Sequence, residues 1–421
     1  MRLTTCLWVA AIAVLSWAAL PACGGSLAVA LDSTTINFYD TETGTETGTF
    51  DMTTVEPFGS IYCLDYDADN GDLWVGLQGG TAENPVSDYV HVLRDVDGTL
   101  QSVHSFSPIP RSGANPNVYD IEVVAGLDAD TPEVYVSNNW RYAYHVSLTH
   151  YDGTNVNTCF TTDTGDGKGF EGLTTGTGNN LWLMTGASHR NLNNRLYDRS
   201  TVPGSSSTLY PASSGDAGRG ATFYPGTVTI NEVEATGVVL VGFADMNNGR
   251  IDAYAEDGSY LGQFANYKFG LFSAKGVRDL EIDEDNAVYT LSIRDSGDNT
   301  QFRPQVAKYV YDTDTATTFH FFETGTVLNA VSYYLPPATI LGDVNGDGVV
   351  DGLDIQPFVD LLTGGGYQAE ADINEDTVVD GLDIQPFVDI ITGAGGNPVP
   401  EPATLSLLAI GGVALLRRRM R

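Results

Sequence analysis

The sequence predicts an all-β body followed by a small α-helical unit. The chain has 421 residues, enough for two or three domains with a sizeable buried core. Its 47 Gly and 18 Pro, together with 42% apolar residues, are typical of a turn-rich β protein and argue against a helical bundle. The formal net charge of −34 argues against nucleic-acid binding, because such a field repels phosphate backbones.

The first residues have the pattern of a secretory leader. Arg2 precedes an apolar run at residues 7–20, and small residues lead to Ala28-Val29-Ala30, an A-x-A cleavage site ahead of Leu31. Residues 1–30 are therefore predicted to be a signal peptide, since the 14 apolar residues are too few for a membrane anchor. A second cut stays open, because Leu20-Pro21-Ala22-Cys23 loosely resembles a lipoprotein box that would place a lipid on Cys23.

Residues 31–340 contain a loose repeat of roughly 50 to 60 residues, the length range of propeller blades. One recurring element is an apolar strand that runs into an acidic turn, at residues 36–40, 90–95, 148–152, 196–198, 251–254 and 310–312. A second is a strand that starts with an apolar residue, at residues 61–65, 118–122, 170–173, 221–224, 277–281 and 328–332. The chain opens with the later strands of a blade and closes with an early one, so both ends are expected to complete one blade.

These repeats predict a six-bladed β-propeller closed by both chain ends, with the composite blade one strand short. The body loosely resembles NHL-type propellers, while five blades or a β-sandwich remain alternatives. Export leaves Cys63 and Cys159, which this arrangement places on an innermost strand and on an outermost strand of the next blade. That separation is too large for a disulfide, so two buried free thiols are expected.

Three basic residues mark a candidate anion-binding surface on the body. Lys168, Arg219 and Lys275 each precede a Gly and an apolar residue at the start of an innermost strand, which places them at the mouth of the central channel. They predict binding of an acidic polysaccharide; the alternative is that they form ion pairs with neighbouring acids. Asp65, Asp67 and Asp69 suggest a cation loop, but ordinary hairpin-turn chemistry is the preferred interpretation.

The clearest signal is an exact repeat at a spacing of 29 residues, in which residues 349–360 recur as residues 378–389. Each copy closes a twelve-residue loop that presents oxygen ligands at the spacing that Ca²⁺ requires. The predicted ligands are Asp343, Asn345, Asp347, the Val349 carbonyl, Asp351 and Asp354 in the first loop, and Asp372, Asn374, Asp376, the Val378 carbonyl, Asp380 and Asp383 in the second.

This pair of loops, each followed by an apolar helix, resembles the type I dockerin over about residues 341–396. The resemblance implies two bound Ca²⁺ ions and a cohesin-like partner, with the partner surface at Gly352, Leu353, Gly381 and Leu382. Thr377 stands where the first loop has Gly348, which predicts a weaker second site. Pro357 and Pro386 predict that each helix starts late or kinks. Residues 341–397 hold 12 acidic residues and no Lys or Arg, so the unit is expected to need metal to fold.

The C-terminal residues 398–421 have the order of a sorting signal. Pro400-Glu401-Pro402 is followed by an apolar stretch at residues 403–416 and then by Arg417, Arg418, Arg419 and Arg421. This order resembles the PEP-CTERM tail. The resemblance implies cleavage by an exosortase, a short transmembrane helix that holds the precursor in the inner membrane, and final placement at the cell surface or in the extracellular matrix.

The chain is thus expected to be an exported bacterial surface protein, with domains at residues 31–340, 341–397 and 398–421 after the signal peptide. The body is expected to be a binding or scaffold element in a polysaccharide-rich envelope. The alternative is a carbohydrate-active enzyme, a glycoside hydrolase or polysaccharide lyase, in a dockerin-assembled complex. No catalytic residues are assigned, because the body shows no nucleophile elbow and no paired-carboxylate signature.

Overall fold

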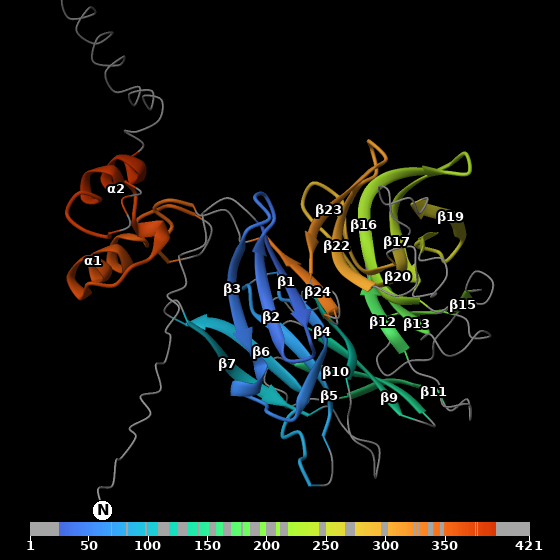
Figure 1. Cartoon of the computed structure of the whole chain (residues 1–421). Coiled ribbons are helices and arrows are strands. Elements are labelled where there is room, and N and C mark those ends of the chain that lie inside the picture. The colour runs from blue at the N-terminus through green and yellow to red at the C-terminus, as the bar shows by residue number, and fades with distance from the viewer. Residues whose placement is uncertain are drawn as a thin grey trace, which may run out of the picture. The chain divides into compact units, whose positions relative to one another are not determined.

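A computed structural model gives the structure of the protein in two compact units, Met1–Pro336 and Pro337–Arg421 (Figure 1). It describes residues 25–392 except for gaps at 69, 81–82, 97–98, 108–117, 125–132, 141–142, 151–156, 163–169, 178–179, 186–193, 199–207, 211–217, 244–249, 266–273, 296–301, 323–325, 327, 336–339, 346–348, 375 and 377. The predicted signal peptide up to Gly24 and the predicted sorting tail therefore lie outside the described residues.

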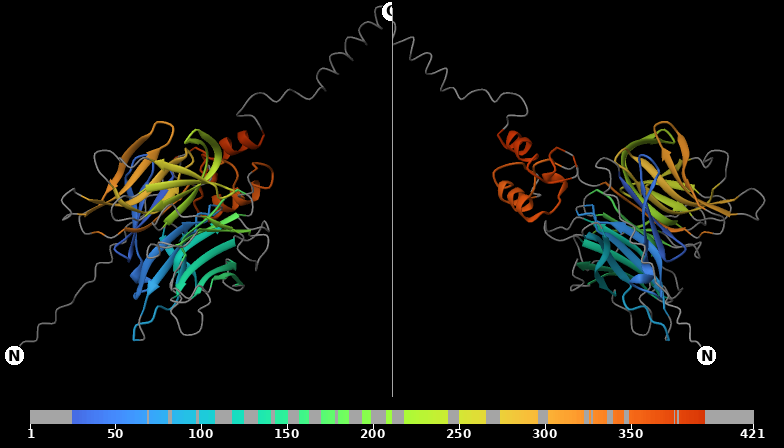
Figure 2. Two further views of the ribbon diagram at one scale, coloured as in Figure 1. Left: turned by 90° about the vertical axis from the view of Figure 1, so that its right-hand side faces the viewer. Right: turned by 60° about the vertical axis from the view of Figure 1, so that its left-hand side comes forward.

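The first unit is a propeller-like body of six antiparallel four-stranded sheets, and its sheets follow one another in chain order (Figures 1 and 2). The first three sheets, written from the innermost strand outward, are β24 (Leu328–Tyr334), β1 (Ser26–Leu31), β2 (Thr35–Asp40), β3 (Glu46–Asp51); β4 (Gly59–Tyr66), β5 (Leu73–Gly79), β6 (Val90–Val96), β7 (Thr99–Phe106); and β8 (Val118–Val124), β9 (Glu133–Trp140), β10 (Ala143–His150), β11 (Asn157–Thr162).

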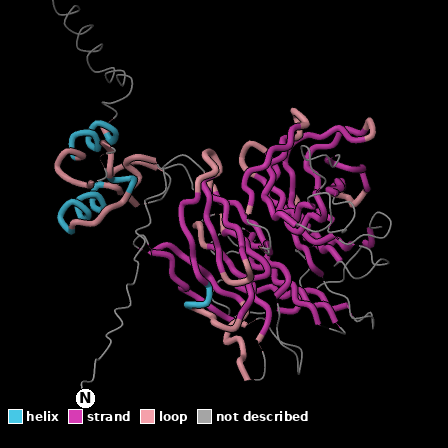
Figure 3. Tube along the Cα trace, viewed as in Figure 1, coloured by secondary structure: helices cyan, strands magenta, loops and turns pink. Residues whose placement is uncertain are grey.

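The remaining three sheets are β12 (Phe170–Thr175), β13 (Asn180–Thr185), β14 (Asn194–Asp198), β15 (Thr208–Tyr210); β16 (Gly218–Ile230), β17 (Val233–Phe243), β18 (Arg250–Ala255), β19 (Tyr260–Ala265); and β20 (Ala274–Ile282), β21 (Ala287–Asp295), β22 (Phe302–Val310), β23 (Thr315–Phe321). The number of sheets agrees with the six repeats counted in the sequence. Within the described part of this unit the only helix is η1 (Met52–Thr54), a single 3₁₀ turn (Figure 3).

The position of each strand in its sheet explains its residue pattern. The second strand of a sheet is covered on both faces by the neighbouring sheets, so β5 has five consecutive buried residues from Leu73 to Leu77. The outermost strand faces solvent on one side, and β7 accordingly alternates between exposed and partly buried residues. The apolar cores therefore lie between sheets, as in the cluster of Ile61, Leu77 and Ile36 from two adjacent sheets.

The sheet that joins the two ends of the body corrects two sequence predictions. It has four strands and not three, because Ser26–Leu31 forms β1 between β24 and β2. Leu27, Ala28, Val29 and Ala30 are completely buried there. The A-x-A triplet at residues 28–30 is therefore part of an interior strand, and cleavage ahead of Leu31 would remove nearly all of it. Ala28 and Ala30 match the pattern of a cleavage site, but their small size fits the close packing of neighbouring sheets against β1.

Polar side chains on the innermost strands connect neighbouring sheets at four places. Asp65 of β4 accepts the Val123 N–H of β8 at 2.5 Å, and Asp120 of β8 accepts the Leu173 N–H of β12 at 2.5 Å. Asp279 of β20 accepts the Val331 N–H of β24 at 3.0 Å, and the Tyr66 N–H of β4 donates to Ser332 Oγ of β24 at 3.0 Å. The six innermost strands also contact one another in a closed cycle.

The second unit contains α1 (Ile355–Gly364), the 3₁₀ turn η3 (Ala369–Ala371) and α2 (Ile384–Ile391). Phe358 and Phe387 occupy equivalent positions of the two helices and stack with ring centroids 4.0 Å apart, at the centre of a small core. Contrary to the expectation from the sequence, the helices do not start late: they begin at Ile355 and Ile384, two residues before Pro357 and Pro386. Each proline is the third helical residue, where the missing N–H has no intrahelical acceptor in any case.

Candidate functional site

Every innermost strand of the body carries a β-bulge near its N-terminal end. In five of them the pairing with the second strand shifts by one residue at this place, so that one extra residue is inserted on the innermost strand, and in β20 two such shifts follow each other. The shifts occur at residues 61–63 of β4, 118–120 of β8, 170–172 of β12, 218–221 of β16, 275–279 of β20 and 328–331 of β24. Bulges redirect side chains, and six at one level form a ring at one end of the strands.

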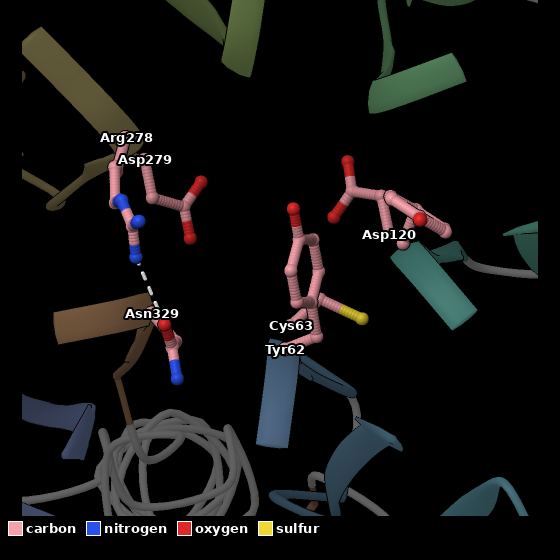
Figure 4. A pocket seen from close by; sticks show the side chains of 7 residues that line it. Tyr62, Cys63, Asp120, Arg278, Asp279 and Asn329 are labelled. Atoms are coloured by element: carbon pink, nitrogen blue, oxygen red, sulfur yellow. Dashed lines mark hydrogen bonds between the residues drawn. The ribbon is translucent and has the colours of Figure 1, made fainter. Parts of the chain in front are cut away.

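The side chains of four of these bulges line a common pocket. Its lining consists of Tyr62, Cys63, Tyr119, Asp120, Arg278, Asp279 and Asn329, and its volume is about 370 Å³ including the part open to solvent (Figure 4). Tyr62 extends into the open space between Asp120 and Asp279, which come from different sheets (Figure 4). Most of that volume is open to solvent, and the space inside that can hold a water-sized molecule is only about 20 Å³, enough for about one water.

The polar groups of this pocket are held by hydrogen bonds that cross from sheet to sheet. Arg278 Nη1 donates to the Leu328 carbonyl at 2.8 Å and to Asn329 Oδ1 at 2.9 Å. Asn329 Nδ2 donates in turn to the Ile61 carbonyl at 2.9 Å. Tyr62 and Tyr119 pack edge to face with ring centroids 5.0 Å apart. The guanidinium and the two phenols therefore occupy fixed positions on three different innermost strands.

Five acidic side chains line the channel between the innermost strands and perturb one another. Burial raises the pKa of Asp65, Asp120 and Glu281, and neighbouring carboxylates, Glu122 among them, raise these pKa values further. Burial also raises the pKa of Asp279 to about 7, although the N–H groups of Val331 and Leu280 oppose the change. Asp279 is therefore largely protonated at mildly acidic pH.

Both oxygens of the two pocket aspartates are used by the fold. Asp120 accepts the Ile121 N–H at 3.1 Å as well as that of Leu173, and Asp279 accepts the Leu280 N–H at 3.0 Å as well as that of Val331. Each carboxyl therefore fixes one bulge to the next sheet. The pair therefore has a structural role.

The two cysteines lie on the strands that the sequence predicts. Cys63 is a buried free cysteine on innermost strand β4, and burial raises the pKa of its thiol, which makes it unreactive. Cys159 is on β11, the outermost strand of the next sheet, and its side chain lies outside the described residues.

The three predicted anion-binding residues are only partly located. Lys168 lies outside the described residues, while Arg219 is in the bulge of β16 and Lys275 is beside the bulge of β20, both without described side chains. Close packing explains why a Gly follows Arg219, because a Cβ atom on Gly220 would lie 2.5 Å from Asp279 Cα. The basic–Gly–apolar pattern thus partly reflects close packing of neighbouring strands.

Sequence reasoning missed most of the pocket. Tyr62, Tyr119 and Asn329 stand directly after the apolar residue that begins an innermost strand, at the position that Arg278 occupies in β20. Aligning the starts of the six predicted strands would have shown that these four residues occupy equivalent positions. The residue type at this position differs from sheet to sheet, however, so the four residues form no recognisable sequence motif.

The acidic turn after β4 is an ordinary hairpin turn in the described residues. Asn70 Nδ2 donates to Asp67 Oδ2 at 2.7 Å, and the Asp72 N–H donates to Asn70 Oδ1 at 2.8 Å. Arg94 binds both oxygens of the buried Asp72 at 2.7 and 2.6 Å. Asp69 lies outside the described residues, so the hydrogen bonds of this turn are described for Asp67, Asn70 and Asp72.

The duplicated acidic loops have duplicated geometry. Asp354 accepts the N–H groups of Asn345 at 3.0 Å and Asp351 at 2.8 Å. Its counterpart Asp383 accepts those of Asn374 at 3.1 Å and Asp380 at 2.9 Å. The last carboxylate of each loop therefore closes the loop onto itself just before the helix begins.

The first and last carboxylates of each loop are also buried. Asp343 and Asp372 are 5% and 3% exposed, and Asp354 and Asp383 are 0% exposed. No Lys or Arg occurs between residues 341 and 397 to neutralise them. Backbone N–H groups satisfy only part of this buried negative charge, so the donor set fits a hard cation that prefers oxygen ligands. Asp347 and Thr377 lie outside the described residues, and within those residues no cluster of three or more His, Cys, Asp or Glu side chains has metal-site geometry.

The predicted partner residues lie on an exposed surface. Leu353 and Leu382 are 67% and 66% exposed, and no atom lies within 4 Å of where a Cβ of Gly352 or Gly381 would be. Ile355 and Ile384, at equivalent positions, are also exposed. The repeat therefore presents the same apolar patch twice.

The comparisons with known proteins identify the C-terminal tail. Residues 398–421 match the PEP-CTERM protein-sorting motif. The tail is a sorting signal. No curated protein matches the chain, and among the described residues no helix is long and apolar enough to cross a bilayer.

Solved structures similar to this chain include a protein of unknown function from Bacteroides caccae, at 11% identity and a TM-score of 0.46 over 74% of this chain and 98% of that chain. A chain of the nidogen/laminin complex matches at 12% identity and a TM-score of 0.33 over 74% of this chain and 99% of that chain. The Dos1 propeller matches at 15% identity and a TM-score of 0.35 over 65% of this chain and 63% of that chain. Similarity at this level carries no information on ligand or activity.

Proposed function

We propose that this exported, surface-sorted protein carries a ligand-binding propeller and docks through a calcium-dependent module. The sorting motif at residues 398–421 supports export and recognition by an exosortase. The observation that carries the calcium proposal is the pair of duplicated loops with four buried carboxylates and no basic residue to neutralise them. Two Ca²⁺ ions would supply that neutralisation, one in each loop.

The calcium proposal is tested by circular dichroism and limited proteolysis of the mature protein, with and without chelator. Helix content and protection of residues 341–397 are expected to fall when Ca²⁺ is removed, because the buried carboxylates then repel one another. Asp354→Asn should lower affinity at the first site at least tenfold, since it removes a buried charged ligand. Asp360→Asn is the matched control, because Asp360 is exposed, its carboxylate accepts from Gln356 Nε2 at 2.8 Å, and it lies outside the loop. A spectrum that does not respond to chelator would contradict the proposal.

Docking is proposed to use the duplicated apolar patch and a cohesin-like domain as partner. Leu353 and Leu382 are large exposed apolar side chains at equivalent places, which is the kind of surface that a partner covers. Titration with a panel of cohesin-like domains should show binding that requires Ca²⁺ and is lost in the Leu353→Glu/Leu382→Glu variant. Binding by that variant at wild-type affinity would place the partner surface elsewhere.

The body is proposed to bind an acidic polysaccharide at the end where the six bulges lie, and not to act as an enzyme. Arg219 and Lys275 are at or beside bulges of this ring, and Arg278 lines its pocket. The two pocket aspartates, the obvious candidates for acid–base catalysis, have both oxygens engaged by backbone N–H groups.

Binding of pectate or alginate by the mature protein, compared with a neutral glucan, tests this proposal. Affinity should fall as salt rises and in the Lys168→Ala/Arg219→Ala/Lys275→Ala variant, with an unchanged melting temperature. Release of reducing or unsaturated ends from the same polymers would instead favour a carbohydrate-active enzyme.

A further inference from the structure

The position of β1 determines where the leader can be removed, and therefore what happens to Cys23. This residue lies two positions before Gly25, where the described part of the body begins. We propose that the leader is cut between Ala22 and Cys23, that the Cys23 thiol carries a diacylglyceryl group, and that this lipid anchors the body by the end opposite the ring of bulges. The anchor is independent of the proposed ligand and calcium sites.

The fold restricts the cut to a short stretch of the leader. Ser26 is 4% exposed, and residues 27–30 are completely buried in the interior strand β1. The carbonyl of Gly25 accepts the N–H and the hydroxyl of Thr41 at 2.9 and 3.0 Å, so Gly25 also belongs to the folded body. Leader peptides are cut shortly after their apolar run, which ends here at Leu20. The cut therefore falls between Leu20 and Gly25.

Within this stretch the bond before Cys23 has the pattern of lipoprotein processing. An ordinary leader site has small residues at the first and third positions before the cut, and Leu20 does not fit the third position. A lipoprotein box has a large apolar residue at that position, a small residue directly before the cut and a Cys directly after it. Leu20, Ala22 and Cys23 match these three positions, and Pro21 is the one departure.

The other cut that the sequence offers conflicts with the burial of Gly25. Ala22 and Gly24 would satisfy the ordinary pattern for a cut after Gly24. That cut would place a charged α-amino group on Gly25, which is buried and packs closely against the ring of Tyr333. Removing an ammonium group from water is costly. A cut before Cys23 instead moves the amino group two residues away from the packed position.

The modification needs a glycerophospholipid such as phosphatidylglycerol as co-reactant and the lipoprotein-processing enzymes of the host. The Cys23 sulfur attacks the glyceryl carbon that bears the phosphate. The C–S bond forms, the C–O bond breaks, the electron pair leaves with the phosphate headgroup, and the thiol proton passes to a base. Water then hydrolyses the Ala22–Cys23 peptide bond. Two acyl chains on one residue provide stable membrane binding, which a single chain does not.

The register of β1 places this anchor at a defined end of the body. Ser26 pairs with Tyr334, the last residue of β24, whereas the bulge of β24 lies near the opposite end of that strand, at residues 328–331. Residues 23–25 span at most about 10 Å when fully extended. A lipid on Cys23 therefore holds the Ser26 end of the body close to the membrane, and the ring of bulges faces away from it.

Mass spectrometry tests the modification in the full chain, expressed with its own leader in a bacterial host that processes lipoproteins. Cleavage before Asp32 should release a peptide of residues 23–31 that carries a diacylglyceryl group. Cys23→Ser should incorporate no labelled fatty acid above background. Cys6→Ser, in the part of the leader that is removed, is the matched control and should be labelled like wild type. Pro21→Ala should be labelled at least as completely, because it removes the departure from the box.

The identity of the first residue decides the question. An unmodified N-terminus at Cys23, at Gly25 or elsewhere overturns the proposal, as does an uncut chain without lipid on Cys23. An uncut chain with the lipid on Cys23 supports it, because the thiol is modified before the peptide bond is cut.

Fluorescence quenching in vesicles tests which end of the body is anchored. Glu42→Cys and Phe58→Cys, each in a Cys159→Ser background, place a dye at exposed positions beside Thr41 and just before β4, at opposite ends of the body. With a quencher on the headgroups of phosphatidylethanolamine and phosphatidylglycerol vesicles, the dye at position 42 should be quenched more strongly, and the difference should disappear in Cys23→Ser. Equal or stronger quenching at position 58 would overturn the orientation.

Discussion

The strand β1 provides the sharpest test of the structure, because a conventional cleavage site lies inside it. A mature chain that begins at Leu31 lacks Leu27 and Val29, each worth about 1.5 to 3 kcal/mol when fully buried, and two alanine methyl groups at about 0.8 kcal/mol each. It also lacks most of the hydrogen-bonded pairing of β1 with β2 on one side and with β24 on the other. At about 0.5 to 1.5 kcal/mol net for each hydrogen bond, the total is comparable to the 5 to 15 kcal/mol that stabilise a whole domain.

A chain that begins at Gly25 keeps the strand and two further contacts. The N–H and the hydroxyl of Thr41 donate to the Gly25 carbonyl at 2.9 and 3.0 Å, and a side chain at this position would meet Tyr333. We therefore expect the leader to be cut upstream of Gly25. Such a cut retains all of β1.

Two forms of the chain, one starting at residue 25 and one at residue 31, can be compared directly by thermal unfolding and limited proteolysis. The longer form should unfold cooperatively, and the shorter form should be digested rapidly between β2 and β3 and between β23 and β24, where the composite sheet has lost its second strand. N-terminal sequencing of the protein exported by a host should show a first residue no later than Gly25. A stable form that starts at Leu31, with the melting temperature of the longer form, would refute the assignment of β1.

Three further predictions concern the body and the calcium unit. The pKa of Asp279 is raised to about 7, against 3.8 for an ordinary Asp, so this group stabilises the body below the unfolded value and its contribution is lost as pH rises through 7. The melting temperature should therefore fall from pH 5.5 to pH 8 by an amount equivalent to about 2 kcal/mol, because only the pH range between 5.5 and the pKa contributes, and Asp279→Asn should flatten this dependence. Phe387→Ala should cost the calcium-loaded second unit about 3 to 5 kcal/mol, measured by denaturant unfolding, because it removes the partner of Phe358; equal stability would contradict the shared core. Thr377→Gly should tighten the weaker calcium site roughly fivefold in calorimetric titration, and two equal sites in the wild type would count against the strain at Thr377.

The sequence by itself determined the features that depend on local spacing. The 29-residue repeat places six candidate oxygen ligands in each loop at fixed intervals, and this spacing predicts a calcium site in each loop without knowledge of the fold. The sorting motif at Pro400-Glu401-Pro402 is likewise read from adjacent residues. The number of sheets and the strands that carry Cys63 and Cys159 followed from the strand period, because each sheet is built from consecutive segments of the chain.

Only the tertiary structure decided the features that depend on residues far apart in the chain. Ala28-Val29-Ala30 has the composition of a cleavage site, and only the pairing of β1 with β24, some 300 residues away, shows that these residues are buried in a sheet. Tyr62, Tyr119, Arg278 and Asn329 come from four sheets and share no motif, because what they have in common is a bulge at one level of the channel. The pKa of Asp279 is raised by burial that no local pattern encodes, since the surrounding strands come from the whole length of the body. Local spacing therefore predicts the candidate ligands of the loops, whereas the contacts between the innermost strands decided which residues of the body meet at its centre.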